Sequence, residues 1–401
     1  MSDDAIRFLT RLGQALNTYG TPAHRLEDAL RACADALGLE AQVFSTPTSL
    51  HAAFGTPPNQ RPVLLRIEPG DANLEKLVDL DRVFNDVCLK RLDVAAGLEV
   101  IDAILARRPR YGQVWQVGML SLASACAATL LGGAVEVVLL VLVNSLVVGL
   151  LLLISRANRH LSRVVEFAAG AFAGSVAQIE ASIFGFDHAT TFLVTLATVI
   201  VILPGLTVTV AATELATRNL VSGTARLMGA GMILMSVVFG VAIGLRLGSV
   251  LEVTPGEVTE APTWMWILAL LLAPVSFGVL FQARPRDLAL ISVTCIAGFG
   301  GARLGAVLFD FAELGVGLGA FVVGAAANVY ARWRDRPAVV LSVPGIMLLV
   351  PGAVGFRGIT ALLEQDAVGG VQTIFSMLVV AASLVGGLLI ANATVPPRKA
   401  L

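Results

Sequence analysis

Apolar and polar positions divide the chain into two parts. Residues 1–113 mix apolar residues with ordinary numbers of Asp, Glu and Arg, whereas residues 114–395 form long apolar segments separated by short polar joints. A membrane-crossing helix needs about 20 apolar residues, and ten segments have a suitable length. They run at about 114–132, 134–154, 165–184, 189–205, 223–246, 263–283, 286–304, 315–332, 337–352 and 370–392. The pattern predicts a polytopic α-helical membrane protein with ten transmembrane helices.

The first part has the pattern of a small α+β domain. Residues 5–37 predict two amphipathic helices, because apolar residues recur at helical spacing on both sides of a Gly20-Thr21-Pro22 break. Short apolar or alternating segments then predict three strands, and a longer helical pattern follows. The strands are expected at 41–45, 49–54 and 62–67, and the helical pattern at 73–107. We expect residues 1–113 to form an N-terminal α+β domain.

The membrane part contains an internal duplication. Moving the sequence by 147 residues pairs Pro204 with Pro351 and Gly205 with Gly352, and the match continues into the following helix, where Thr213 meets Thr360. A matched helix break followed by further matches at the same offset indicates a repeat. We expect one five-helix repeat at 114–248 and a second at 263–395, joined by a loop at 249–262.

Basic residues occur at every second joint, and they predict the orientation. Cytoplasmic joints carry an excess of Lys and Arg. The residues are Arg107, Arg108, Arg110, Arg156, Arg159, Arg163, Arg218, Arg226, Arg284, Arg286, Arg332, Arg334, Arg336, Arg398 and Lys399. Both termini and the N-terminal domain are therefore expected in the cytoplasm, the 249–262 loop outside it, and the protein in the cytoplasmic (inner) membrane. Five helices per copy make the copies antiparallel, which is the inverted-repeat plan of many secondary transporters.

Composition agrees with a membrane protein and excludes other classes. Of 401 residues, 56% are hydrophobic and only 14% charged. The four cysteines lack metal-binding or paired spacing, so we expect no metal, no cofactor and no disulfide framework. A net charge of −1 argues against a nucleic-acid partner. The sequence contains neither a nucleophile motif nor paired carboxylates that would indicate an enzyme.

The repeated Pro-Gly break is the candidate binding site. Proline and glycine interrupt a helix, and broken backbone is tolerated in a membrane only where protein buries it or a wet cavity adjoins it. A helix that begins at such a break directs its N-H groups toward the cavity and suits a carboxylate. The candidate substrate-binding residues are Pro204, Gly205, Thr207, Thr213, Glu214, Pro351, Gly352, Arg357, Thr360 and Asn144.

Two of these candidates carry further expectations. Glu214 is the first candidate for a proton carrier or a partner of a substrate ammonium group, because an intramembrane carboxylate is functional by default. Asn144 is either a contact between helices or a substrate contact. Glu166, Gln178, Glu180 and Asp310 lie near segment ends, and we expect them to be solvated.

The chain resembles the threonine/serine exporter family. In the first part the resemblance rests on the stretch 8–54, with Leu12-Gly13, Tyr19-Gly20-Thr21-Pro22 and Phe44-Ser45-Thr46-Pro47-Thr48-Ser49. In the membrane part it rests on Ile202-Leu203-Pro204-Gly205 through Gly223 and on Val343-Pro344-Gly345 through Gly352. The resemblance implies export of small hydroxylated amino acids driven by the proton gradient, and some relatives are associated with dicarboxylates such as succinate. Glu214 and Arg357 come from physical reasoning and not from the family.

The leading hypothesis is a secondary active exporter of threonine and serine, a proton-coupled antiporter that works by alternating access. Its partners would be a small-molecule substrate, protons and the lipid bilayer. The sequence leaves open whether the protein forms a homo-oligomer. A dicarboxylate exporter is the first alternative. A channel, or a membrane regulator with the N-terminal domain as a sensor, is the second.

Overall fold

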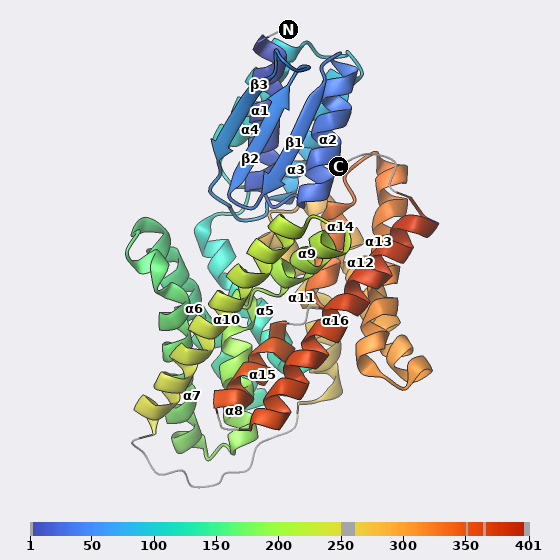
Figure 1. The fold of residues 1–401 in the computed structure, drawn as a ribbon. Coiled ribbons are helices and arrows are strands. Elements are labelled where there is room, and N and C mark those ends of the chain that lie inside the picture. Colours follow the sequence, from blue (N-terminus) through green and yellow to red (C-terminus); the bar gives the residue numbers. More distant parts are fainter. Residues whose placement is uncertain (1–2, 250–260, 350–351, 364–365, 397–401) are drawn as a thin grey trace.

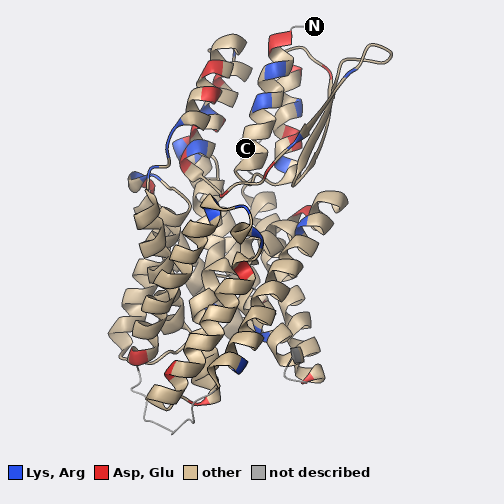
Figure 2. Cartoon of the chain, turned by 90° about the vertical axis from the view of Figure 1, so that its left-hand side faces the viewer, with Lys and Arg blue, Asp and Glu red and all other residues tan. Residues whose placement is uncertain are grey.

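A computed structural model describes residues 3–249, 261–349, 352–363 and 366–396. Strands and short helices form a domain at one end of a bundle of long helices, and the chain begins in that domain (Figure 1). We call residues 3–106 the head and the helices from residue 113 onward the membrane body. Charged residues are concentrated in the head and near the ends of the long helices (Figure 2).

The head combines four helices with a three-stranded antiparallel sheet in the order β1-β2-β3. Its elements are α1 (Asp3–Thr18), α2 (Ala23–Ala36), β1 (Ala41–Thr46), β2 (Ser49–Phe54), β3 (Arg61–Arg66), α3 (Leu74–Cys88) and α4 (Val94–Ala106). Phe8, Leu12 and Leu16 of α1 are fully or almost fully buried, because their spacing places them on one face of the helix. They form the core of the head with Leu26 of α2 and Leu50 of β2. The three strands lie within about one residue of their predicted positions.

The membrane body consists of twelve helices among the described residues. They are α5 (Gln113–Leu130), α6 (Val135–Ala157), α7 (Val165–Phe184), α8 (His188–Val199), α9 (Gly205–Ala216), α10 (Leu220–Gly248), α11 (Thr263–Leu280), α12 (Pro285–Phe309), α13 (Ala312–Arg334), α14 (Val339–Met347), α15 (Gly352–Leu363) and α16 (Ala367–Thr394). Two short 3-10 turns, η1 (Leu161–Arg163) and η2 (Ile200–Ile202), lie between them.

In the described part of the chain, eight helices are long and apolar enough to cross a membrane, counting α14 and α15 together as one. The bent pair formed by α8 with η2 and α9 raises the number to nine. The chain is therefore a polytopic membrane protein. Helix α5 occupies the first of the ten predicted segments but is not among the eight, so the count of ten stays a prediction.

The two predicted breaks lie in direct contact. After η2, Leu203 is extended and α9 begins at Gly205, so the two parts of this helix meet at 58°. In the second copy α14 ends at Met347 and α15 begins at Gly352, while Pro351 lies outside the described residues. A Cβ atom added at Gly352 would lie 3.4 Å from the Cα atom of Gly205. Figure 1 shows α9 beside the head and α15 toward the opposite end of the body.

Close glycine contacts join α7 to α10 and α13 to α16. A Cβ atom at Gly240 would lie 2.2 Å from the carbonyl oxygen of Phe167, and one at Gly387 would lie 2.1 Å from that of Gly317. Small residues let membrane helices pack backbone against backbone. Gly387 stands 147 residues after Gly240, and the carbonyl groups that the two glycines approach are 150 residues apart, so the second part of the duplication repeats the same kind of helix contact.

Ion pairs connect the head to the arginines at the joints of the membrane body. Arg110 binds Glu75 at 2.5 Å, and Arg284 binds Asp79 at 2.5 Å. Arg107 also binds Asp79, at 2.8 Å, and Arg156 binds Asp71 at 2.7 Å. Several of the basic joints thus lie at the same end of the body as the head.

We predict that Gly240→Ala lowers the thermal stability of the detergent-purified protein. The added methyl group meets the Phe167 carbonyl oxygen, which cannot move aside as a flexible side chain can, and overpacking of this kind costs about 1–3 kcal/mol. Gly231→Ala, on the same helix, is the control because a Cβ atom there meets no atom within 4 Å. Equal melting temperatures for the two variants would contradict the packing of α7 on α10.

Candidate transport site

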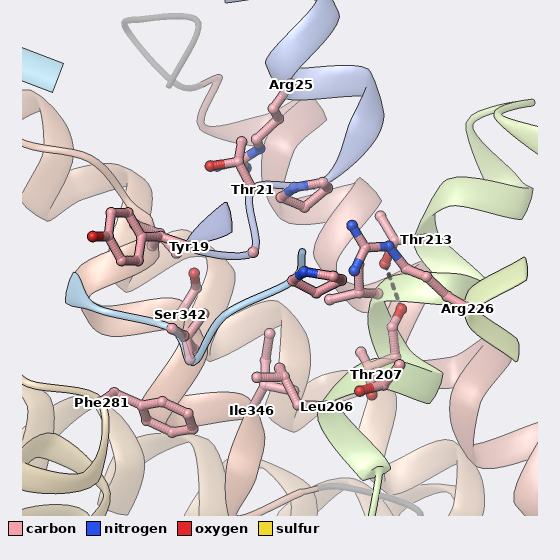
Figure 3. Close-up of a pocket in the computed structure, with 18 of the residues that line it drawn as sticks. Tyr19, Thr21, Arg25, Leu206, Thr207, Thr213, Arg226, Phe281, Ser342 and Ile346 are labelled. Atoms are coloured by element: carbon pink, nitrogen blue, oxygen red, sulfur yellow. Dashed lines mark hydrogen bonds between the residues drawn. The ribbon is translucent and has the colours of Figure 1, made fainter. Parts of the chain in front are cut away.

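A cavity of about 720 Å³ lies where the head meets the two broken helices. Head loops contribute Tyr19 and Thr21, and the membrane body contributes Thr207, Asn328 and Ser342. The close-up in Figure 3 shows polar groups of the head on one side and α9 and α14 residues on the others. The volume falls in the range of small-molecule binding sites.

The break at Pro204 gives α9 its position at this cavity. Pro204 caps α9 with non-helical backbone angles, and Gly205 starts the helix. Pro204, Thr207 and Thr213 all line the cavity, whereas Gly205 is buried against the second break. The Thr213 hydroxyl donates to the Thr209 carbonyl at 2.9 Å, while the Thr207 hydroxyl has no hydrogen bond among the described residues. Thr207 can therefore offer its hydroxyl to a ligand.

Glu214 lies behind the cavity wall and not in it. Its side chain is fully buried, and one carboxylate oxygen accepts a hydrogen bond of 2.9 Å from the backbone N-H of Ala23 in the head. The other accepts one of 2.8 Å from the Ser222 hydroxyl. The guanidinium Nε of Arg226 lies 3.1 Å from both oxygens. We call these four residues, Ala23, Glu214, Ser222 and Arg226, the Glu214 clasp.

The clasp fixes the direction of the Arg226 guanidinium. Nε is turned toward Glu214, and the two terminal nitrogens have no hydrogen bond among the described residues. Arg226 lines the cavity, and Figure 3 shows its guanidinium pointing into it. A guanidinium edge of this kind matches a carboxylate with two parallel hydrogen bonds. Arg226 is thus placed to bind an anionic group, and Glu214 is placed to hold Arg226.

The head adds a second cation to the cavity wall. Arg25, in the first turn of α2, lines the cavity and forms no ion pair within the described part of the chain. Burial lowers the pKa of Arg25 below its usual range, but a guanidinium stays charged in proteins. Figure 3 shows Arg25 beside Thr21. An unpaired cation at this position favours an anionic ligand.

His24, next to Arg25, also lines the cavity. Burial, with a smaller contribution from the Arg25 charge, lowers the pKa of His24 from 6.5 to about 4. Its Nδ1 atom is buried and has no hydrogen-bond partner in the structure. The imidazole is therefore neutral at physiological pH, and the positive charge of this wall comes from arginine.

The remaining predicted residues lie elsewhere. Asn144 does not line the cavity. Its side-chain amide donates a hydrogen bond to Glu180 on α7. Arg357 is exposed and lines a separate hollow of about 550 Å³ that also contains Thr360. The Thr360 hydroxyl donates to the Phe356 carbonyl at 2.9 Å. The break in the first repeat thus faces the cavity, whereas the polar residues after the second break do not.

Sequence reasoning missed Arg25 and placed Arg226 only among the basic joints. The head and α9 are 191 residues apart where Ala23 donates a hydrogen bond to Glu214, so their contact at the cavity is not visible in the local sequence. The break Gly20-Thr21-Pro22 was one available signal, since this loop covers the cavity and Gly20 adopts a positive φ of 86°. Among the described residues, no group of three or more His, Cys, Asp or Glu could hold a metal ion.

A polytopic helical body with a cavity at two touching helix breaks is an arrangement found in many membrane transporters. The comparisons with known proteins agree: the model "Putative threonine/serine exporter" matches residues 7–248, and "Threonine/Serine exporter, ThrE" matches residues 266–394. The chain belongs to the threonine/serine exporter family. This is a family of exporters and not of enzymes.

Curated relatives from fungi carry a different name. "Pheromone-regulated membrane protein 10" of Debaryomyces hansenii is 26% identical over 360 residues, which are 87% of this chain and 36% of the relative. The Saccharomyces cerevisiae protein of that name is 26% identical over 357 residues, 87% of this chain and 46% of the relative. This chain therefore spans less than half the length of these relatives. No solved structure matches it.

We predict that Glu214→Ala strongly destabilises the protein. It leaves the Arg226 cation, whose side chain is only 14% exposed, without its partner, and breaking a buried ion pair from one side costs about 3–5 kcal/mol. Asp102→Ala, which removes the exposed partner of Arg11, is the control and should cost at most about 1 kcal/mol. Melting temperatures of the two variants in detergent measure both losses of stability. Similar decreases in melting temperature would show that the Glu214 clasp does not stabilise the structure.

The lowered pKa of His24 predicts a pH dependence of stability. Between about pH 4 and 6.5 the unfolded chain binds a proton at this histidine that the folded chain does not, so acidification lowers the free energy of unfolding in that window. His24→Gln should lose stability less steeply than the wild type from pH 6.5 to pH 4. Changing the exposed His160 to Gln should leave the wild-type curve unaltered. Coinciding curves for wild type and His24→Gln would refute the assignment.

Proposed function

We propose that this protein is a secondary active exporter of threonine and serine that exchanges them for protons by alternating access. The observation that carries the proposal is the free guanidinium edge of Arg226 in a cavity formed by the first helix break. The family membership supports the substrate class. Substrate, proton and lipid bilayer would be its partners.

The lining of the cavity suits each part of a small hydroxylated amino acid. The substrate carboxylate would bind the terminal nitrogens of Arg226, with Arg25 adding a second positive charge. Hydroxyl groups such as those of Thr207 and Ser342 would receive the substrate hydroxyl and ammonium groups. Leu206, together with Phe281 and Ile346, provides apolar surface for its carbon atoms (Figure 3).

The arrangement of the breaks supports alternating access. We place two inverted five-helix halves at 114–248 and 263–395, which meet where Gly352 contacts Gly205. Helix α9 lies beside the head and α15 toward the other end, as antiparallel halves would place them. Rocking of one half against the other would open the cavity to each side in turn.

The basic joints support an orientation with the head in the cytoplasm. Arg107, Arg110, Arg156 and Arg284 bind acidic side chains of the head, so these joints lie at its end of the body. Cytoplasmic joints carry the excess of arginine. Both termini would then be cytoplasmic, and the cavity would be covered on the cytoplasmic side by the head.

A dicarboxylate is the second candidate substrate. Arg25 and Arg226 give the cavity two cations, whereas the one acidic side chain among its described lining residues, Asp71, is exposed and already bound to Arg156. A substrate with two carboxylates would neutralise both arginines. A substrate panel containing threonine, serine and succinate therefore separates the two candidates.

We predict that Arg226→Lys lowers threonine efflux from proteoliposomes at least about tenfold at subsaturating substrate. Lysine can keep the charge beside Glu214 but loses the two-pronged guanidinium contact, and hydrogen bonds to charged groups contribute about 1.5–3 kcal/mol. Arg218→Lys is the control, because Arg218 is exposed and does not line the cavity.

Three results would contradict the proposal. An unchanged rate in Arg226→Lys would remove this arginine from the site. Absence of any threonine or serine transport by the wild type under a proton gradient would overturn the substrate class. A flux that neither saturates nor responds to the gradient would indicate a channel.

A further inference from the structure

Glu180 of α7 is a buried carboxylate inside the membrane body, with only 8% of its surface exposed. The expectation that Glu180 is solvated at a segment end is wrong. Ala173 and Ala177, seven and three residues before it, are buried as well, so Glu180 lies on the face of α7 that packs against its neighbours. Tertiary packing and not position along the segment decides its environment.

The partner of Glu180 is neutral. The side-chain amide of Asn144 on α6 lies 3.0 and 3.1 Å from its two oxygens. The other buried carboxylates of the described membrane helices have cations: Glu214 binds Arg226 at 3.1 Å, and Asp287 binds Arg336 at 2.7 Å. In the described part of the membrane body, Glu180 is therefore the buried carboxylate without a cation.

The charged groups on the elements packed against α7 do not supply that cation. None forms an ion pair or hydrogen bond with Glu180 among the described residues. Arg226 is bound to Glu214, Arg156 is bound to Asp71 in the head, and Arg246 is exposed. The further titratable groups of these elements are Glu136 of α6, Glu166 of α7 itself, His160 and Arg163 at η1, and His188 of α8. An isolated carboxylate in such a site is far more stable protonated than ionised.

Buried hydroxyl groups extend from the region of Glu180 toward the transport cavity. After a short turn at residues 185–187, α8 runs back beside α7 and carries Thr191, Thr195 and Thr198 on one buried face. The Thr198 hydroxyl is buried without a hydrogen-bond partner in the structure. Directly after it, η2 brings Val201 and Ile202 to the cavity wall. This face of α8 thus runs from the turn that follows α7 to the cavity wall, and the hydroxyls of Thr191 and Thr195 donate to backbone carbonyls of the preceding turn.

We propose that Glu180 is the proton carrier of the antiport, with Asn144 as the partner that stabilises it. A proton from outside binds a carboxylate oxygen of Glu180 to give the neutral acid, and the same O-H bond breaks when the proton leaves toward the cytoplasm. The Asn144 amide donates to the ionised form and can turn its carbonyl oxygen toward the protonated form. This inference rests on the proposed proton exchange.

The duplication agrees with a single coupling site. The helices before the break recur 150 residues later, since α6 begins at Val135 and α12 at Pro285. At this offset the positions matching Asn144 and Glu180 hold Thr294 and Tyr330, which are neither an amide nor a carboxylate. The pair therefore occurs only in the first half. Glu214 is the carboxylate first expected to carry the proton. In this proposal its role is to position Arg226.

Glu180→Gln tests the proposal in proteoliposomes that contain a pH-sensitive dye. Glutamine keeps the size and hydrogen-bonding capacity but cannot take up the proton. We expect proton-driven threonine efflux and the accompanying proton movement to fall at least tenfold, while exchange of labelled for unlabelled threonine stays within twofold of the wild type. Glu166→Gln, a half-buried carboxylate at the start of the same helix, should behave as the wild type.

Each outcome either supports or overturns the assignment of Glu180 as the proton carrier. Wild-type proton coupling in Glu180→Gln would overturn the proposal, and so would loss of exchange together with efflux in a variant that remains folded. If the wild type itself transports no threonine, the proposed function fails, but the infrared band of a protonated carboxyl group still tests Glu180. That band must weaken in Glu180→Gln and shift in Asn144→Ala. An unchanged band in both variants would show that Glu180 is not the protonated group.

Discussion

Backbone groups without a helical partner cannot face lipid, and this constraint governs the membrane body. At Leu203-Pro204-Gly205 the helix stops and restarts at 58°, and the exposed groups must be covered by protein or by a polar cavity. Gly352, where α15 begins, lies against Gly205, where α9 begins, so the starts of the two helices cover each other. The cavity lies beside this contact, and α9 runs from it toward the head.

The turn of α9 makes the head part of the site. Glu214, two turns along α9, receives the Ala23 N-H from the head and the Arg226 guanidinium from α10. One buried carboxylate therefore joins three elements and orients the cation that faces the cavity. The head also supplies Arg25 and Thr21 to the cavity wall, so this domain forms part of the proposed substrate site.

Patterns that are local in sequence predicted the corresponding structure. Apolar length located the long helices, alternation located β1 to β3, and the Pro-Gly repeat located both breaks. Long-range contacts were not predictable in this way. Nothing near Glu214 indicates that Ala23 will bind it, and nothing near Glu180 indicates that Asn144, 36 residues earlier, will be its partner. Thr213 and Thr360 match in the repeat but face different hollows.

The central claim is that the substrate carboxylate binds the free edge of Arg226 in the cavity between the head and the first helix break. A cryo-electron microscopy structure of the protein with threonine tests it most directly. The account predicts threonine density in this cavity, with its carboxylate within hydrogen-bond distance of the terminal nitrogens of Arg226. Density at the hollow beside Arg357 instead, with the cavity at Arg226 empty, would contradict it.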